Sequence, residues 1–266
     1  MFEISAIGAG HMGMAMLDGM VKSGQFEPSE ILVYEINTER RRQAKQRGYA
    51  AAGSESEAYA NAKILLLAVR PQECRALLEK LARSAERQEA KPTIISIMAG
   101  ISSNYIRSHL GENTAVICAM PSMGMTTGHG TAAISKTSNV PREAFDKITA
   151  VFGATGEAHP VEEGTLKEIV AVCGCMPGYV FYLLDAFAKG AAGVGYDEAV
   201  RIAARGFIGA AMKVLDEGDV QGLLAEVCTP GGLTARGVEV FEQGGVGKVL
   251  GEGMAASVRR GYELGE

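Results

Sequence analysis

The sequence predicts an α/β protein: a Rossmann-like dinucleotide-binding domain over residues 1–162, then an all-helical domain over residues 163–266. Three observations support this division. A glycine-rich loop follows the first apolar segment, short β-rich runs alternate with helical patterns up to about residue 160, and no convincing strand follows. Strand and helix alternating in this way favour a parallel sheet with helices on both faces.

Each element of the first domain has a local pattern. The predicted strands cover residues 3–7, 31–34, 64–69, 93–97, 114–120 and 131–134, with helices between them at residues 14–22, 39–47 and 74–83. The runs "ILLLAV" and "TIISI" are almost wholly apolar. That composition is typical of central parallel strands, which are buried on both faces.

The second domain is rich in alanine and leucine, as in "DEAVRIAARGFIGAAMKVLDEG". Residues 169–184 form its longest uncharged apolar stretch, interrupted by Gly174, Pro177 and Gly178. A membrane span usually needs about 20 apolar residues, so we interpret this stretch as a buried helix. So much apolar surface on a helical half predicts burial against a second copy, that is, a homodimer or a larger homo-oligomer.

The loop Gly8-Ala9-Gly10-His11-Met12-Gly13 fits the pattern G-x-G-x-x-G between a strand and a helix. The glycines permit a tight turn and the close approach of a pyrophosphate, whose charge the helix N-terminus stabilises. A purely structural turn is the alternative. The surrounding strand and helix favour dinucleotide binding by these six residues.

Further residues should contact the same cofactor. Glu35 ends the second strand and can accept hydrogen bonds from the adenosine ribose, which favours NADH slightly over NADPH. A solvated strand end is the alternative, and Arg40, Arg41 and Arg42 are placed to reach a 2′-phosphate. Two more loops follow predicted parallel strands; the residues we expect to line the cofactor there are Ala68, Val69, Arg70, Pro71, Ala99 and Gly100. Arg70 is equally interpretable as a surface charge.

A second glycine loop, "CTPGGLT", covers residues 228–234. Pro-Gly-Gly between helical stretches leaves backbone N–H groups unpaired, and Thr234 stands where the N-cap hydroxyl of the next helix belongs. A helix start of this kind suits a carboxylate or phosphate. An ordinary turn between helices is the alternative.

Six motifs occur in one order: "IGAGHMG", "LAVRPQ", "ISIMAGIS", "AMPSMG", "CGCMPGYVFYLLDA" and "VCTPGGLT". Together they resemble the pyrroline-5-carboxylate reductases, and the likeness runs from Phe2 to about Leu264. The resemblance implies NAD(P)H-dependent reduction of a cyclic imine to L-proline, the last step of proline biosynthesis. It also implies homodimers built by the helical domain, often assembled further.

The same resemblance implies the substrate site. Gly231, Gly232, Leu233 and Thr234 would hold the substrate carboxylate and imine, with Glu217 nearby. The Thr234 hydroxyl would hydrogen-bond the imine nitrogen and help to deliver its proton, which makes it the candidate catalytic residue.

The chain departs from the family pattern around the expected pocket. Arg70 replaces the usual lysine, Ser122-Met123-Gly124 replaces "NTP", and Cys173-Gly174-Cys175-Met176 replaces "SGSG". Fewer hydroxyl and amide groups suggest altered specificity. Glu55, where the family has a short amide, disfavours a 2′-phosphate. Three alternatives remain: a reductase of a related imine, a nucleotide-binding protein without catalysis, and a hydroxyacid-type dehydrogenase. The last needs an acid/base, but Lys167 and Lys189 are more easily interpreted as solvated charges.

Composition excludes other classes. The net charge is −5, so no basic surface for nucleic acid is expected. The N-terminal residues predict no signal peptide, and five cysteines without CxxC spacing predict reduced thiols. Four widely spaced histidines predict no metal site. We therefore expect a cytoplasmic enzyme with a small-molecule substrate and no association with a membrane.

Overall fold

The computed structural model describes residues 1–88 and 90–264. By contacts the chain divides into two compact units. The first comprises Met1–Cys175 and the described residues from Ser257 onward, and the second comprises Met176–Ala256. The predicted domain boundary at residues 162/163 stays a prediction, because these units are defined by packing and not by function.

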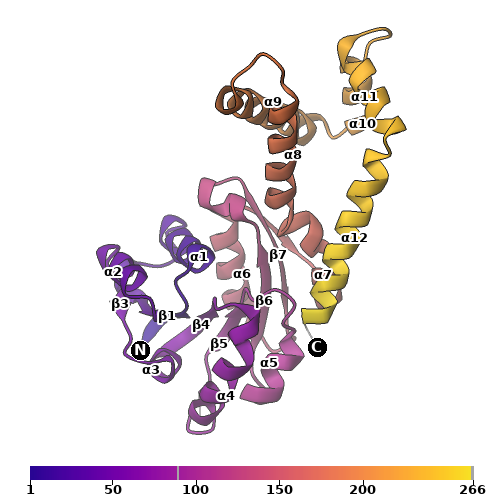
Figure 1. Cartoon of the computed structure of the whole chain (residues 1–266). Coiled ribbons are helices and arrows are strands. Elements are labelled where there is room, and N and C mark those ends of the chain that lie inside the picture. Colours follow the sequence, from indigo (N-terminus) through magenta and orange to yellow (C-terminus); the bar gives the residue numbers. More distant parts are fainter. Residues whose placement is uncertain (89, 265–266) are drawn as a thin grey trace. The chain divides into compact units, whose positions relative to one another are not determined.

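The first unit is built on an eight-stranded sheet of order β3-β2-β1-β4-β5-β6-β7-β8 (Figure 1). Its strands are β1 Phe2–Ile7, β2 Ile31–Tyr34, β3 Ala50–Ala51, β4 Ala62–Leu67, β5 Thr93–Ser96, β6 Val116–Pro121, β7 Gly130–Lys136 and β8 Gly156–Pro160. The predicted α/β fold, with a Rossmann-like domain before an all-helical half, is confirmed.

The sheet is mainly parallel, as the alternation of strands and helices favoured, but it contains one antiparallel pair. Strand β7 runs antiparallel to β6. Only residues 122–129, with the 3₁₀ helix η3 Met123–Thr127, join the two strands. A parallel connection needs roughly a dozen or more residues, so this short link can only make a hairpin-like return. Strands β3 and β8 were also missed, because a two-residue strand and the polar segment "GEAHP" carry almost no strand pattern.

Helices cover both faces of the sheet (Figure 1). They are α1 His11–Lys22, α2 Thr38–Gln46, α3 Glu55–Ala60, α4 Cys74–Ala85, α5 Ser103–Leu110, α6 Arg142–Gly153 and α7 Glu163–Cys173. Side chains of α1 and α6, such as Leu17 and Phe152, form one core, and those of α3–α5, such as Tyr59 and Leu78, form the other. Residues Leu65–Leu67 of β4 are completely buried, which explains their unbroken apolar run.

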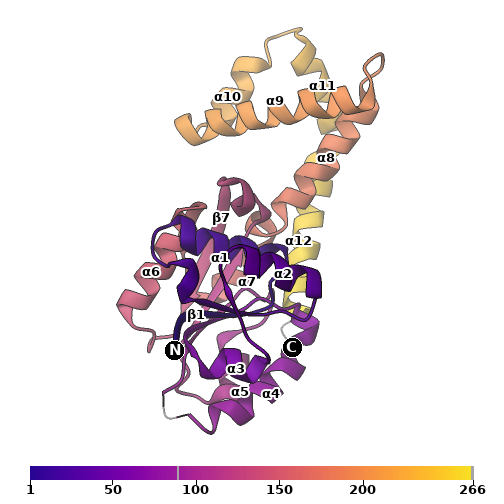
Figure 2. The same ribbon diagram turned by 90° about the vertical axis from the view of Figure 1, so that its left-hand side faces the viewer.

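The second unit consists of helices alone: α8 Met176–Gly190, α9 Tyr196–Glu217, α10 Val220–Val227, α11 Leu233–Gln243 and the start of α12 Val246–Leu264 (Figure 2). The ring of Phe187 on α8 contacts Phe207 and Phe241, with centroids 6.0 and 6.1 Å apart. Among its described residues, only Ala188 and Ala199 are buried. The unit therefore has almost no interior within one chain.

We predicted that residues 169–184 form one buried helix, and this prediction was wrong. The stretch is broken at Gly174-Cys175, where α7 ends and α8 begins. Phe181 and Tyr182 of α8 are 57% and 73% exposed. The apolar composition that predicted burial therefore describes a face that is exposed in the single chain.

One described segment, Glu163–Gly190, is long and apolar enough to cross a membrane by length and composition. It includes both α7 and α8, and only 11% of its most apolar window is buried. Helices that pack against another protein chain meet the same criteria, so this observation is weak evidence for a membrane span.

All five cysteines are free thiols. Cys74, Cys118 and Cys173 are buried. Burial raises the pKa of Cys74 to about 11 and raises the pKa of both Cys118 and Cys173. These three thiols are therefore protonated at neutral pH.

The first loop gives a stability test. Gly8 has a φ of +95°, and a Cβ there would lie 2.6 Å from the carbonyl oxygen of Ala68. We expect Gly8→Ala to lower the free energy of unfolding by roughly 2–5 kcal/mol, from backbone strain and overlap together. The control is Gly24→Ala, at a φ of +69° in open space, which should cost about 1–2 kcal/mol. Urea unfolding followed by circular dichroism measures both, and equal losses would exclude the overlap.

Candidate active site

A cavity of about 720 Å³ lies at the carboxyl ends of β1, β2 and β4. Of the predicted cofactor residues, Gly8, Gly10, His11, Glu35, Ala68, Val69 and Arg70 line it. Ala9, Met12, Gly13 and Pro71 belong to the same two segments of the chain, with Met12 and Gly13 in the first turn of α1, but they do not line the cavity. The sequence missed Tyr34, Asn37, Glu73 and Lys80 in its walls, whereas Arg40, which we expected to be able to reach a 2′-phosphate, does line it. Ligands of parallel α/β sheets bind at this edge, where the strand order reverses.

The glycine loop is held close to the neighbouring strand end. A Cβ on Gly13 would lie 2.6 Å from the Gly8 oxygen and 3.0 Å from the Ala68 Cβ. Helix α1 starts at His11 with Gly10 as its N-cap, and no side chain caps it. The first-turn N–H groups of His11, Met12 and Gly13 thus have no partner within the described chain. Such a helix start favours a phosphate.

Glu35 is only 5% exposed, so the alternative of a solvated strand end is wrong. One carboxylate oxygen accepts the N–H of Ala9 at 2.7 Å, and the other accepts the N–H of Asn37 at 2.8 Å. Each oxygen keeps further acceptor capacity, so a ribose contact stays a prediction. The observed role of Glu35 is to fix the glycine loop to the end of β2.

The three arginines of α2 have different environments. The Nε of Arg41 donates to the Glu35 carbonyl at 3.0 Å, and Arg42 forms an ion pair with Glu39 at 2.6 Å. Arg40 alone of the three lines the cavity, and its guanidinium has no hydrogen-bond partner among the described side chains. The sequence could not choose among them, because their direction depends on where the helix begins.

Glu55, the first residue of α3, also lines the cavity. The Lys80 ammonium donates to its carboxylate at 2.9 Å. Burial raises the pKa of Glu55, but the Lys80 hydrogen bond and smaller contributions outweigh burial and bring the pKa below its ordinary value. Its negative charge is therefore partly compensated, which weakens the predicted repulsion of a 2′-phosphate.

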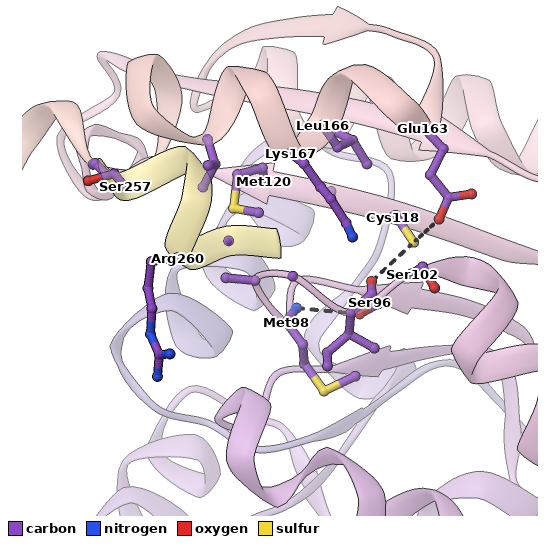
Figure 3. Close-up of a pocket in the computed structure, with 17 residues that line it drawn as sticks. Ser96, Met98, Ser102, Cys118, Met120, Glu163, Leu166, Lys167, Ser257 and Arg260 are labelled. Carbon is purple, nitrogen blue, oxygen red and sulfur yellow. Dashed lines mark hydrogen bonds between the residues drawn. The ribbon is translucent and has the colours of Figure 1, made fainter. Parts of the chain in front are cut away.

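A second cavity, of about 250 Å³, opens where β5 and β6 end (Figure 3). The predicted residues Ala99 and Gly100 line it, with apolar walls from Met98, Ile101, Met120, Leu166 and Val170. Helix α7 and the last turns of α12 complete its lining. Lys167 of α7, which we expected to be a solvated charge, is half-buried: it lines this cavity, and its ammonium lies 4.7 Å from the Tyr262 ring centroid.

The substrate candidates all lie in the second unit. The N–H of Gly232 donates to the Thr229 carbonyl at 2.8 Å, and Gly231 has a φ of +73°. This turn starts α11 at Leu233 with Gly232 as the N-cap. Thr234 is therefore the second helical residue, and its prediction as the N-cap was wrong, because Gly231 and Gly232 complete the reversal earlier in the chain.

Glu217 is less clearly connected to that turn. It ends α9, and its carboxylate forms an ion pair with Lys213 on the same helix. Helix α10 separates it in sequence from Gly231–Thr234. The structure thus brings four substrate candidates into one turn, and leaves the contribution of Glu217 as a prediction.

A Rossmann-like unit whose glycine loop opens a helix without a side-chain cap, followed by an all-helical unit, is typical of nicotinamide-dependent oxidoreductases. Residues 3–100 match the family model described as NADP oxidoreductase coenzyme F420-dependent, and residues 163–264 match that for pyrroline-5-carboxylate reductase dimerisation. The chain belongs to the pyrroline-5-carboxylate reductase family, which confirms the resemblance seen in the sequence.

The likeness covers nearly the full length of the relatives. The chain is 30% identical to pyrroline-5-carboxylate reductase of Escherichia coli strain K12, over 98% of both chains. It is 32% identical to that of Synechocystis sp. PCC 6803, over 99% of this chain and 98% of the relative. The fold matches Plasmodium falciparum pyrroline carboxylate reductase with NADP bound, with a TM-score of 0.89 at 19% identity over 100% and 98% of the chains.

The position of Glu35 predicts a binding defect. In Glu35→Ala the buried N–H of Ala9 loses its acceptor, which costs about 1–3 kcal/mol and frees the glycine loop. We expect the affinity for NADH and NADPH to fall roughly tenfold, since about 1.4 kcal/mol corresponds to a factor of ten. Glu35→Gln keeps an acceptor and should lose less. Fluorescence titration measures both variants, and unchanged binding by Glu35→Ala would contradict this role.

Proposed function

We propose that this chain reduces 1-pyrroline-5-carboxylate to L-proline with a nicotinamide cofactor. The observation that carries the proposal is the 30–32% identity, over nearly the whole chain, to proteins named pyrroline-5-carboxylate reductase. The glycine loop of the first unit and the turn Thr229–Thr234 of the second supply the two kinds of anion-binding site that this reaction needs.

The turn before α11 suits the substrate carboxylate. The first-turn N–H groups of Leu233, Thr234 and Ala235 have no partner within the described chain, and the positive end of the helix dipole lies there. Thr234 is exposed, so its hydroxyl is free to meet a ligand. A carboxylate bound to these N–H groups would place the adjacent ring nitrogen within reach of that hydroxyl.

When bound, the dinucleotide supplies a hydride from nicotinamide C4 to the imine carbon. The imine nitrogen must also gain one proton, which solvent supplies; the Thr234 hydroxyl would hydrogen-bond the nitrogen and orient it to receive that proton while keeping its own. The rest of the chain positions the cofactor and the substrate: N–H groups at the start of α1 would bind the pyrophosphate, and those at the start of α11 would bind the substrate carboxylate.

For the cofactor we propose a slight preference for NADH. The buried carboxylate of Glu35 ends β2, and Glu55 adds a second carboxylate to the same cavity. Both disfavour a 2′-phosphate. Arg40 and Lys80 oppose them: the Arg40 guanidinium has no hydrogen-bond partner among the described residues, and Lys80 compensates Glu55, so the preference should be small.

We propose further that the protein acts in the cytoplasm as a homodimer or a larger homo-oligomer. The exposed apolar side chains of the second unit support association, since Ile202, Met212 and Leu215 are each at least 60% exposed. The match to a dimerisation model over residues 163–264 supports it as well. Five free thiols suit a reducing compartment.

A related cyclic imine is the second candidate substrate. Cys175 lines the second cavity, where the family pattern has a serine, and Met123 is 51% exposed just after β6. Thiol and thioether groups offer weaker hydrogen bonds than hydroxyl or amide groups, which favours a less polar ring.

The direct test is oxidation of NADH and of NADPH by the purified protein, with and without 1-pyrroline-5-carboxylate. We expect substrate-dependent loss of absorbance with both cofactors, and a higher kcat/KM with NADH. Activity with other cyclic imines but not with this one would support the second candidate. Cofactor binding with no turnover of any imine would overturn the enzymatic proposal.

Thr234→Ala tests the proton-orienting hydroxyl. We expect kcat to fall roughly 100-fold, as for loss of a proton-transfer group, with the dissociation constant for NADH unchanged. Thr229→Ala is the matched control, because only the backbone carbonyl of Thr229 closes the turn. Equal turnover by both variants would remove the role of Thr234.

A further inference from the structure

Glu163 joins two elements that lie far apart in the sequence. It is the first residue of α7, and its carboxylate receives two hydrogen bonds from Ser103 at the start of α5. The Ser103 N–H donates to one oxygen at 2.6 Å, and the Ser103 hydroxyl donates to the other at 2.5 Å. Both oxygens are therefore used on one residue, 60 positions earlier in the chain.

The contact gives a hydrogen-bond acceptor to a backbone N–H at the start of α5. Ser102 is the N-cap and accepts the N–H of Tyr105 at 3.1 Å, which leaves the N–H of Ser103 without a partner inside its own helix. A carboxylate from outside satisfies that N–H and places negative charge at the positive end of the helix dipole. Glu163 is thus a cap supplied by another helix.

The same carboxylate is linked to the loop before α5. The Cys118 sulfur lies 3.9 Å from Glu163 Oε1 and 4.0 Å from the Ile101 carbonyl oxygen. At the other end of the loop, the Met98 N–H is 3.4 Å from the Ser96 hydroxyl (Figure 3). The loop Met98–Ser102 is thereby fixed at both ends, and Glu163 and Cys118 hold its far end.

This loop carries Ala99 and Gly100, which line the second cavity beside Glu163 itself. Gly100 has a φ of +81°, and the Ile101 N–H closes a turn onto the Met98 carbonyl at 3.2 Å. A turn this short has few contacts of its own, so its position depends on the groups that hold its ends.

We propose that Glu163 is a positioning residue for hydride transfer: it fixes the loop Met98–Ser102 so that Ala99 and Gly100 hold the nicotinamide end of the cofactor at the reacting distance. The inference rests on the proposed function, because it assigns these two residues to the cofactor. Small misplacement at such a site is costly, since about 1 Å changes rates by up to roughly 100-fold.

The experiment is Glu163→Ala, with kinetics and cofactor binding measured on the folded protein. We expect kcat to fall roughly 10- to 100-fold, the KM and the dissociation constant for NADH to rise several-fold, and the KM for the imine to stay within a factor of about two. Glu163→Gln keeps one acceptor for the Ser103 N–H and should recover most of the lost kcat.

Glu168→Ala is the matched control on the same helix. Its carboxylate accepts the Tyr262 hydroxyl at 2.6 Å and has no contact with the loop Met98–Ser102 among the described residues. We expect the Glu168→Ala substitution to lower the melting temperature without changing kcat or the KM for NADH. If Glu163→Ala does the same and changes neither constant, Glu163 is only a structural brace and the proposal is overturned.

Two further measurements keep the test decisive. Ser103→Ala removes only the hydroxyl donor. We expect this variant to show a smaller loss of kcat, about threefold, which can be measured even if Glu163→Ala does not fold. An unchanged kcat in Ser103→Ala would overturn the proposal. NADH titration requires no imine. Weaker NADH binding by Glu163→Ala would therefore support the positioning role even if the wild-type protein failed to reduce any imine, and equal binding would contradict it.

Discussion

The close approach of Gly8 to Ala68 is the constraint on which the first unit depends. Strands β1 and β4 pair in parallel from Phe2↔Ala62 to Ile7↔Leu67, and at their ends the two loops come closer than any side chain at Gly8 would allow. Because the loop turns there, Ala9 faces Glu35 and α1 begins immediately at His11. The uncapped start of α1, the Glu35 contact and the cavity at the strand ends all lie beside that contact.

Local patterns in the sequence were enough to predict much of this architecture. Glycine spacing, a strand before it and a helix after it identify the first loop, because all three act within about twenty residues. Helix boundaries such as those of α1 and α4 came within a few residues for the same reason. The reversed direction of β7 was also knowable in principle, since it depends only on the length of residues 122–129.

What the sequence could not supply were the pairings between distant residues. Nothing local joins Lys80 to Glu55 or Ser103 to Glu163, and the first pair weakens the repulsion that Glu55 was expected to exert on a 2′-phosphate. The direction of Arg40 depends on how α2 is fixed to the sheet. The shift of the N-cap from Thr234 to Gly232 has a smaller cause, a single left-handed glycine at Gly231.

The buried cysteine thiols can be used to measure local opening of the first unit. Cys74 lies on α4, Cys118 on strand β6 and Cys173 at the end of α7, so they sample three different elements of the first unit. Alkylating reagents are attacked by the thiolate form of cysteine, and burial reduces both access and ionisation at these sites. Their rates of modification therefore measure how often each region separates from its neighbours. A molecule that binds the first unit would slow the three reactions unequally, and the pattern of slowing would map the parts of the sheet it holds closed.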